Sequence, residues 1–155
     1  MKRSFRGVGL KSQEVMVAAP RELVFEVVSS AGKKIGDSPE GKLVEFETHW
    51  RGKQIKTIEA VSLEPPVRIG YRWVEGPLDQ VEEEIVFEAR AADVTLMRYA
   101  GRIAGARGLT GWLRTVLIVR PIFNRLVREH LVAGKEMAEK RARRSHVHPR
   151  QAPER

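Results

Sequence analysis

Two glutamates lie where acid–base chemistry would need them, on strand faces that otherwise carry apolar residues. By period-two alternation, Glu83 shares a face with Val81, Ile85 and Phe87. Glu59 shares a face with Val61 and Thr57 if that segment alternates in the same way. A carboxylate facing an apolar pocket has a raised pKa and can act as an acid or as a polar anchor. The alternative is a carboxylate at a strand end or paired with an arginine, and the sequence alone assigns no catalytic residue.

Other residue types that commonly do chemistry are sparse. The chain has no cysteine, which excludes a disulfide framework, a cysteine zinc site and a thiol nucleophile. His146 and His148 are spaced like metal ligands but have no carboxylates nearby, so we expect no metal site. No serine has the flanking glycines of a nucleophile elbow, and Gly7–Gly9 is too short for a phosphate loop. We therefore expect no cofactor and a binding role, with an enzyme as the alternative.

Positive charge is concentrated at the C-terminus. The net charge is +8, and residues 111–155 hold 11 Lys/Arg against 4 Asp/Glu, whereas residues 1–110 hold 17 against 16. The densest cluster consists of Lys140, Arg141, Arg143 and Arg144. Such a cluster can bind RNA, a ribosome or an anionic membrane through its charges. It can equally be a solvated helix end, because the helix dipole favours cations there.

Length and hydropathy predict one globular domain. The 155 residues, 42% of them apolar, suffice for a single core, which we place in residues 1–145. Residues 146–155 contain two prolines and little apolar surface, so we predict a disordered basic tail. No apolar run is long enough to span a membrane, and no apolar segment follows the basic residues near Met1 as in a signal peptide. We expect a cytoplasmic protein.

The order of predicted elements is strand, helix, meander and long helix. Residues 12–18 alternate as a strand, Pro20 suits the first turn of a helix that Gly32 ends, and residues 33–41 read as a loop. Five strands follow at 44–50, 54–63, 67–74, 80–90 and 94–103. A helical pattern runs from Gly111 to Arg144, which Pro121 should break or kink because proline lacks an N–H, leaving a helix over 122–144. The fold class is α+β with about six antiparallel strands.

One face of the predicted sheet and one face of the last helix could enclose a ligand. Period two and helical spacing place these candidates together: Phe46, Trp50, Tyr71, Trp73, Glu83, Phe87, Met97 and Tyr99 from the strands, with Phe123 and Val127 from the helix. They either line a cavity or fill a core, since any half-buried sheet needs such residues. Tyrosine and tryptophan would add polar groups that orient a ligand.

Four segments of this order resemble the START/SRPBCC superfamily, the helix-grip fold of the birch-pollen-allergen type. Residues 15–28 resemble its first strand, Ala-Pro turn and helix, and residues 63–69 its turn into the fourth strand. Residues 75–78 resemble its Gly-Pro hairpin, and residues 94–99 its last strand. The resemblance implies a helix-grip fold, with a curved antiparallel sheet wrapped around a long C-terminal helix.

The same resemblance, closest to the polyketide-cyclase and lipid-transport-like branch, implies a hydrophobic ligand. That ligand would be a lipid, polyketide or isoprenoid bound between sheet and helix, and some members are aromatase/cyclases. The chain departs from the family between its first two strands, where only residues 31–41 are available for a second helix. That helix is shortened or absent, so we expect an unusually open entrance.

Overall fold

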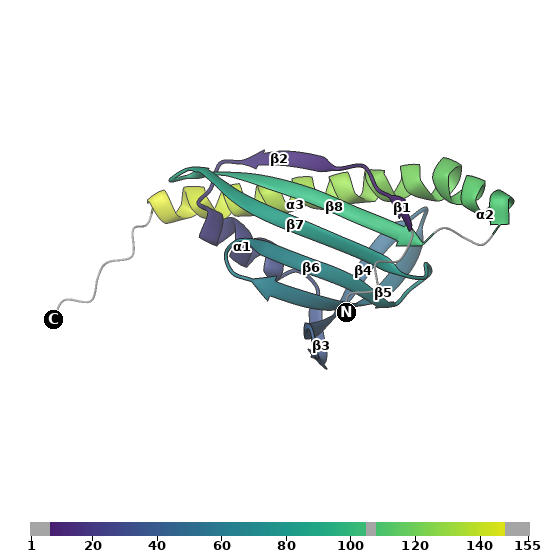
Figure 1. Ribbon diagram of the computed structural model, residues 1–155. Helices are drawn as coiled ribbons and strands as arrows, with labels where there is room; N and C mark the ends of the chain where they lie inside the picture. The colour runs from purple at the N-terminus through teal and green to yellow at the C-terminus, as the bar shows by residue number, and fades with distance from the viewer. Residues whose placement is uncertain (1–6, 105–107, 148–155) are drawn as a thin grey trace.

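The computed structural model describes residues 7–104 and 108–147. Within these residues, one antiparallel sheet of eight strands curves around a long helix (Figure 1). The strands are β1 (Gly7–Gly9), β2 (Gln13–Val17), β3 (Lys33–Ser38), β4 (Gly41–Trp50), β5 (Lys53–Glu64), β6 (Arg68–Glu75), β7 (Val81–Ala91) and β8 (Val94–Ala104). Their order is β1-β8-β7-β6-β5-β4-β3, and β2 also pairs with β8. The predicted α+β helix-grip fold is confirmed, with more strands than the six expected.

The helices lie on the concave face of this sheet. They are α1 (Arg21–Ser29), α2 (Gly108–Arg114), the π-helix η1 (Thr115–Val119) and α3 (Arg120–Val147). The chain enters α1 through Pro20, whose fixed φ suits a helix start. Helix α3, about 42 Å long at 1.5 Å per residue, packs against α1 and β2. No helix among the described residues is long and apolar enough to cross a membrane.

The register places the predicted faces together. Phe46 pairs with Thr57, Glu59 with Trp73, Tyr71 with Glu83, and Ile85 with Tyr99. Directly paired residues in a ladder point to the same side of a sheet. The strand faces predicted by period-two alternation therefore form one continuous concave surface.

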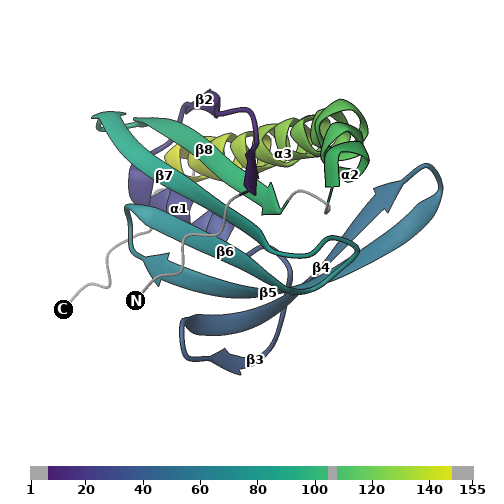
Figure 2. The same ribbon diagram turned by 45° about the vertical axis from the view of Figure 1, so that its right-hand side comes forward.

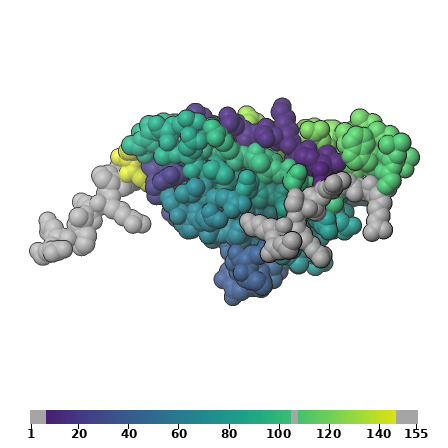
Figure 3. All heavy atoms as spheres, viewed as in Figure 1, coloured from purple at the N-terminus to yellow at the C-terminus, as the bar shows by residue number. Residues whose placement is uncertain are grey.

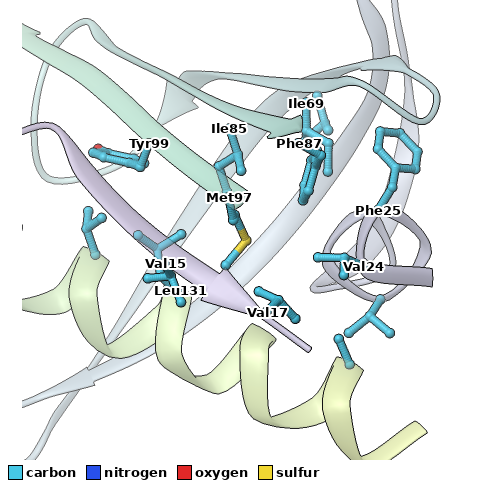
Figure 4. Close-up of a cluster of buried hydrophobic side chains, with 14 of the residues drawn as sticks. Val15, Val17, Val24, Phe25, Ile69, Ile85, Phe87, Met97, Tyr99 and Leu131 are labelled. Carbon is cyan, nitrogen blue, oxygen red and sulfur yellow. The ribbon is translucent and has the colours of Figure 1, made fainter. Parts of the chain in front are cut away.

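The end of the concave face under α1 is a packed core (Figure 4). Phe87 and Met97 are 1% and 0% exposed. The rings of Phe25 and Phe87 meet edge to face at 5.5 Å between centroids, so α1 is fixed to β7 by aromatic packing. Val127 and Leu131 bring α3 onto the same cluster.

Two strands were not predicted. The loop expected at residues 33–41 is wrong, because Lys33–Ser38 forms β3 on the edge of the sheet beside β4. Its residues are mostly exposed and lack apolar alternation, so the pattern that reveals a half-buried strand is absent. The short β1 pairs with the end of β8 and is likewise too short and glycine-rich to signal a strand.

Pro121 does not end the C-terminal helix. Residues 108–147 are helical throughout, and Pro121 lies in the first turn of α3. The wider π-turns of η1 come immediately before it, with the Arg120 N–H donating to the Thr115 carbonyl. The helix also continues to Val147, past the domain end predicted at residue 145. The remainder of the predicted tail, residues 148–155, lies outside the described residues.

The β4–β5 hairpin projects beyond the rest of the sheet (Figure 2). The pairing of β5 with β6 begins at Ile58, and a register shift follows between Ile58 and Glu59. Residues 53–57 therefore pair with β4 alone. The shift places an irregularity of the sheet directly beside Glu59.

Candidate functional site

A polar cluster built around two glutamates lies on the concave face between β5 and β8. Glu59 comes from β5 and Glu83 from β7, with Tyr71 and Trp73 of β6 between them and Tyr99 of β8 beyond. All five point to the concave side because the register pairs them on one face. The sheet thus brings together side chains from four consecutive strands of the meander.

Glu83 accepts two hydrogen bonds through its carboxylate. The Tyr99 hydroxyl donates to Oε1 at 2.7 Å, and Trp73 Nε1 donates to Oε2 at 3.2 Å. The residue keeps some accessible surface, but its carboxylate is enclosed by these partners. Glu83 is therefore held in one orientation by a tyrosine and a tryptophan.

Glu59 is almost completely buried, with 7% of its surface exposed. The Thr57 hydroxyl, on the same face two residues earlier, donates to its Oε1 at 2.8 Å. Among the described residues, neither Glu59 nor Glu83 has an ion-pair partner. Two carboxyl groups thus share an enclosed site without a neutralising cation.

Burial favours the protonated forms of both carboxyl groups, and the charge of Glu83 adds to this effect at Glu59. Desolvation, with a further contribution from the charge of Glu83, raises the pKa of Glu59 to about 8, although the Thr57 hydrogen bond lowers it. Desolvation also raises the pKa of Glu83, against its bonds from Tyr99 and Trp73. The pKa values of Tyr71 and Tyr99 are raised for the same reasons. At neutral pH the glutamate pair therefore holds at least one proton.

Aromatic rings frame the carboxyl groups. Phe46 and Tyr71 meet edge to face at 6.1 Å, and Trp73 lies 5.8 Å from Phe123 of α3. All four are partly exposed although they lie on the concave face. These rings thus pack against the core while each keeps part of its surface accessible.

Two glycines allow the aromatic side chains to take these positions. A Cβ at Gly101, the residue opposite Glu83, would lie 2.5 Å from the Tyr99 hydroxyl oxygen. A Cβ at Gly76 would lie 2.8 Å from Cε3 of Trp73. The absence of side chains at Gly101 and Gly76 leaves the space in which Tyr99 and Trp73 reach Glu83.

Two hollows of the surface lie beside β2, and the second of them is lined in part by Tyr99 of the cluster. A groove of about 450 Å³ runs between the start of β2 and α3, lined by Gln13, Asn124 and Arg128 among others. A second, of about 320 Å³, lies beside β2, β7 and β8 and includes Glu84 and Arg98. Neither hollow is the cavity expected between the concave face and α3. The partly exposed aromatic rings are therefore the surface of the concave face that a ligand could contact.

The structure divides the residues predicted to line the site into three groups. Tyr71, Trp73, Glu83, Tyr99 and Phe123 come together, with Phe46 beside Tyr71. Phe87, Met97 and Val127 belong to the packed core. Trp50 lies further along β4 at the hairpin turn, where the Arg51 guanidinium stands 4.9 Å from the centre of its ring.

Two contributors to the site have no role in the sequence-based prediction. Alternation places Thr57, the partner of Glu59, on the correct face but assigns it no function, and Gly101 gives no signal at all. Period two could have identified the first, because Thr57 and Glu59 share a face two residues apart. Nothing in the sequence near Gly101 reveals that Tyr99 folds over it.

No group of three or more histidine, aspartate or glutamate side chains within residues 7–104 and 108–147 is arranged to hold a metal ion. Within these residues, no third histidine, aspartate or glutamate stands beside the glutamate pair to complete a metal site. Its chemistry is therefore that of hydrogen bonding and proton transfer.

The fold is shared with several solved structures. A protein from Thermus thermophilus superposes with a TM-score of 0.70 at 18% identity, covering 87% of this chain and 99% of the other. The Zhui aromatase/cyclase from Streptomyces sp. R1128 superposes with a TM-score of 0.68 at 18% identity, covering 93% and 98%. A START superfamily protein from Mycobacterium smegmatis gives 0.62 at 17% identity, covering 88% and 99%.

A more distant likeness extends to Ara h 8.0201, with a TM-score of 0.62 at 11% identity, covering 87% of this chain and 97% of the other. No protein-family model and no curated protein matches the sequence. At these identities the likeness concerns the arrangement of strands and helices. The chain has the helix-grip fold of the START/SRPBCC superfamily.

Proposed function

We propose that this protein binds a hydrophobic small molecule, such as a lipid, polyketide or isoprenoid, at the open end of its concave face. The observation that carries the proposal is the accessible aromatic surface of Tyr71, Trp73 and Phe123 around the buried Glu59–Glu83 pair. An apolar molecule gains roughly 25 cal/mol per Å² of apolar surface buried there. The Zhui aromatase/cyclase and the START protein of the same fold support the general class of ligand.

Replacing Trp73 by alanine should weaken binding of a neutral fluorescent probe, N-phenyl-1-naphthylamine, by about tenfold, because the ring supplies much of the accessible apolar surface. Titration of the purified protein followed by fluorescence measures this. Trp112→Ala is the matched control, since Trp112 lies on α2 away from the cluster. Equal probe affinity in the wild type and the Trp73 variant contradicts the proposal.

Native mass spectrometry of the purified protein before and after solvent extraction identifies the natural ligand. An apolar adduct that extraction removes supports a binding protein and gives the ligand class. The adduct should be depleted in the Trp73 variant and retained in the Trp112 variant.

The glutamate pair favours a second candidate, an aromatase/cyclase-like enzyme acting on a polyketide chain. A protonated Glu59 beside Glu83 could donate and accept protons at the ring-forming carbonyls. Glu83→Gln and Tyr99→Phe should then each lower the rate of cyclisation of a poly-β-ketone by about 10²-fold or more, while probe binding changes little. Retention of the wild-type rate in both variants excludes these roles.

A docking role for the C-terminal basic cluster stays a prediction. Arg141 is engaged with Glu26 of α1 at 3.2 Å, so part of the cluster joins α3 to α1. Lys140, Arg143 and Arg144 are exposed or partly exposed and available to RNA, a ribosome or an anionic surface.

A further inference from the structure

Apolar side chains are exposed together on residues 108–119, which we name the helical tip. Leu109, Leu117 and Ile118 are 74%, 68% and 54% exposed, and Trp112 and Leu113 are also exposed. The other large exposed apolar side chains among the described residues are scattered singly: Met16, Ile35, Leu63, Val67, Val74 and Met137. Single exposed apolar residues are ordinary, whereas a group gathered on one element marks an interaction surface.

The position of the tip explains why the fold does not bury it. Helix α2 extends beyond the strands at one end of the molecule (Figure 1), and the tip projects from the surface there (Figure 3). Helix α2 has no buried residue, and Thr115 alone is buried in η1. The apolar segment of η1 and α2 therefore continues past the end of the sheet, and the sheet does not cover it.

The charges of the tip and of the start of α3 have one sign. Residues 108–128 contain Arg114, Arg120, Arg125 and Arg128 and no aspartate or glutamate. Arg125 pairs with the next acidic residue, Glu129, at 3.2 Å, whereas Arg114 is exposed on the tip itself. At the turn of the β4–β5 hairpin, the Arg51 guanidinium lies over the ring of Trp50. A tryptophan beside an arginine is well placed at the boundary between water and lipid. The ring lies among the lipid headgroups, and the guanidinium is attracted to the lipid phosphates.

We propose that the helical tip inserts into the surface of an anionic phospholipid membrane. The apolar side chains enter the boundary between headgroups and acyl chains, and the arginines pair with lipid phosphates. This surface and its partner do not depend on the ligand proposed above. The competing occupant is a second copy of the chain on the same apolar surface. That arrangement is disfavoured because the tip carries no acidic residue that could meet the arginine of the other copy's tip.

The test is flotation of the full chain with vesicles of equal parts phosphatidylglycerol and phosphatidylcholine, compared with phosphatidylcholine alone. We expect binding to the anionic vesicles that weakens with added salt. The double variant Leu117→Ser, Ile118→Ser should weaken partitioning by about a hundredfold, at about tenfold for each side chain. Met137→Ser is the matched control, because Met137 is 59% exposed on the same helical segment but far along α3.

A second pair of variants tests the charge. Arg114→Gln should weaken binding to the anionic vesicles by about fivefold, and Arg90→Gln, at an exposed arginine of β7 outside both the tip and the basic cluster, should not. All these residues are exposed, so the variants are expected to fold. No binding of the wild type to anionic vesicles overturns the proposal. Equal loss in the Arg90 variant also overturns it, as does a dimer in light scattering that the double variant dissociates without changing vesicle binding.

Discussion

Replacing Glu59 by glutamine is expected to stabilise the protein at pH 8 and to leave it nearly unchanged at pH 5. The pKa of Glu59 is about 8 in the folded protein against 4.5 for an unperturbed glutamate, so between these values the folded state holds a proton that the unfolded state releases. The stability that this group contributes is present below pH 4.5 and is lost as the pH rises to 8. The loss is roughly 3 to 5 kcal/mol, which glutamine avoids because it is neutral.

Thermal unfolding of both proteins at pH 5 and pH 8 measures the effect. For a domain of this size, a gain of that order raises Tm at pH 8 by about 10 °C. Glu82→Gln is the control, because Glu82 is an exposed neighbour on β7. Parallel pH dependence in the wild type and the Glu59 variant would show that the Glu59 carboxyl group is not protonated in the folded protein at neutral pH.

At pH 8, ligands with an anionic headgroup are expected to bind at least about 30-fold more weakly than neutral or cationic ligands of equal length. At pH 8, which is about the pKa of Glu59, the pair carries negative charge that no ion-pair partner among the described residues neutralises, so an anion placed beside it meets like charge. At an effective dielectric constant of about 20, a like charge roughly 8 Å away costs about 2 kcal/mol, or about 30-fold in affinity. This expectation rests on the proposed binding function.

Competition of dodecanoate, dodecanol and dodecylamine for N-phenyl-1-naphthylamine, below their micelle concentrations at pH 8, checks the selectivity. The difference should shrink in a Glu59→Gln, Glu83→Gln variant and persist in Glu82→Gln. Dodecanoate binding as tightly as dodecylamine to the wild type would place the headgroup away from the glutamate pair.

The sequence predicted which face of each meander strand points inward, because one face had to be apolar. Alternation in β6 and β7 predicts that Tyr71 and Glu83 point to the same side, and the register confirms it. It could not separate Phe87, which is packed under α1, from Trp73, which is accessible. That difference depends on where α1 and α3 cross the sheet, and no local pattern encodes the crossing.

The elements that were missed lack a buried face. Strand β3 is held by its pairing to β4 rather than by apolar side chains, so periodicity gives no signal for Lys33–Ser38. The helix continues through Pro121 immediately after the π-turns of η1, which no local sequence pattern predicts. The raised pKa of Glu59 likewise depends first on its burial and then on the charge of Glu83, which lies on another strand.

The pairing of β2 with β8 has a consequence for the order in which the molecule is assembled. Gln13 pairs with Tyr99 and donates a hydrogen bond to the Asn124 carbonyl of α3, and the N–H of Ala18, directly after β2, donates to Glu139 of the same helix. Contacts between segments so distant in the chain form slowly, because a long loop must close first. During synthesis, β2 therefore leaves the ribosome among the first elements and waits unpaired until nearly the whole chain has followed it.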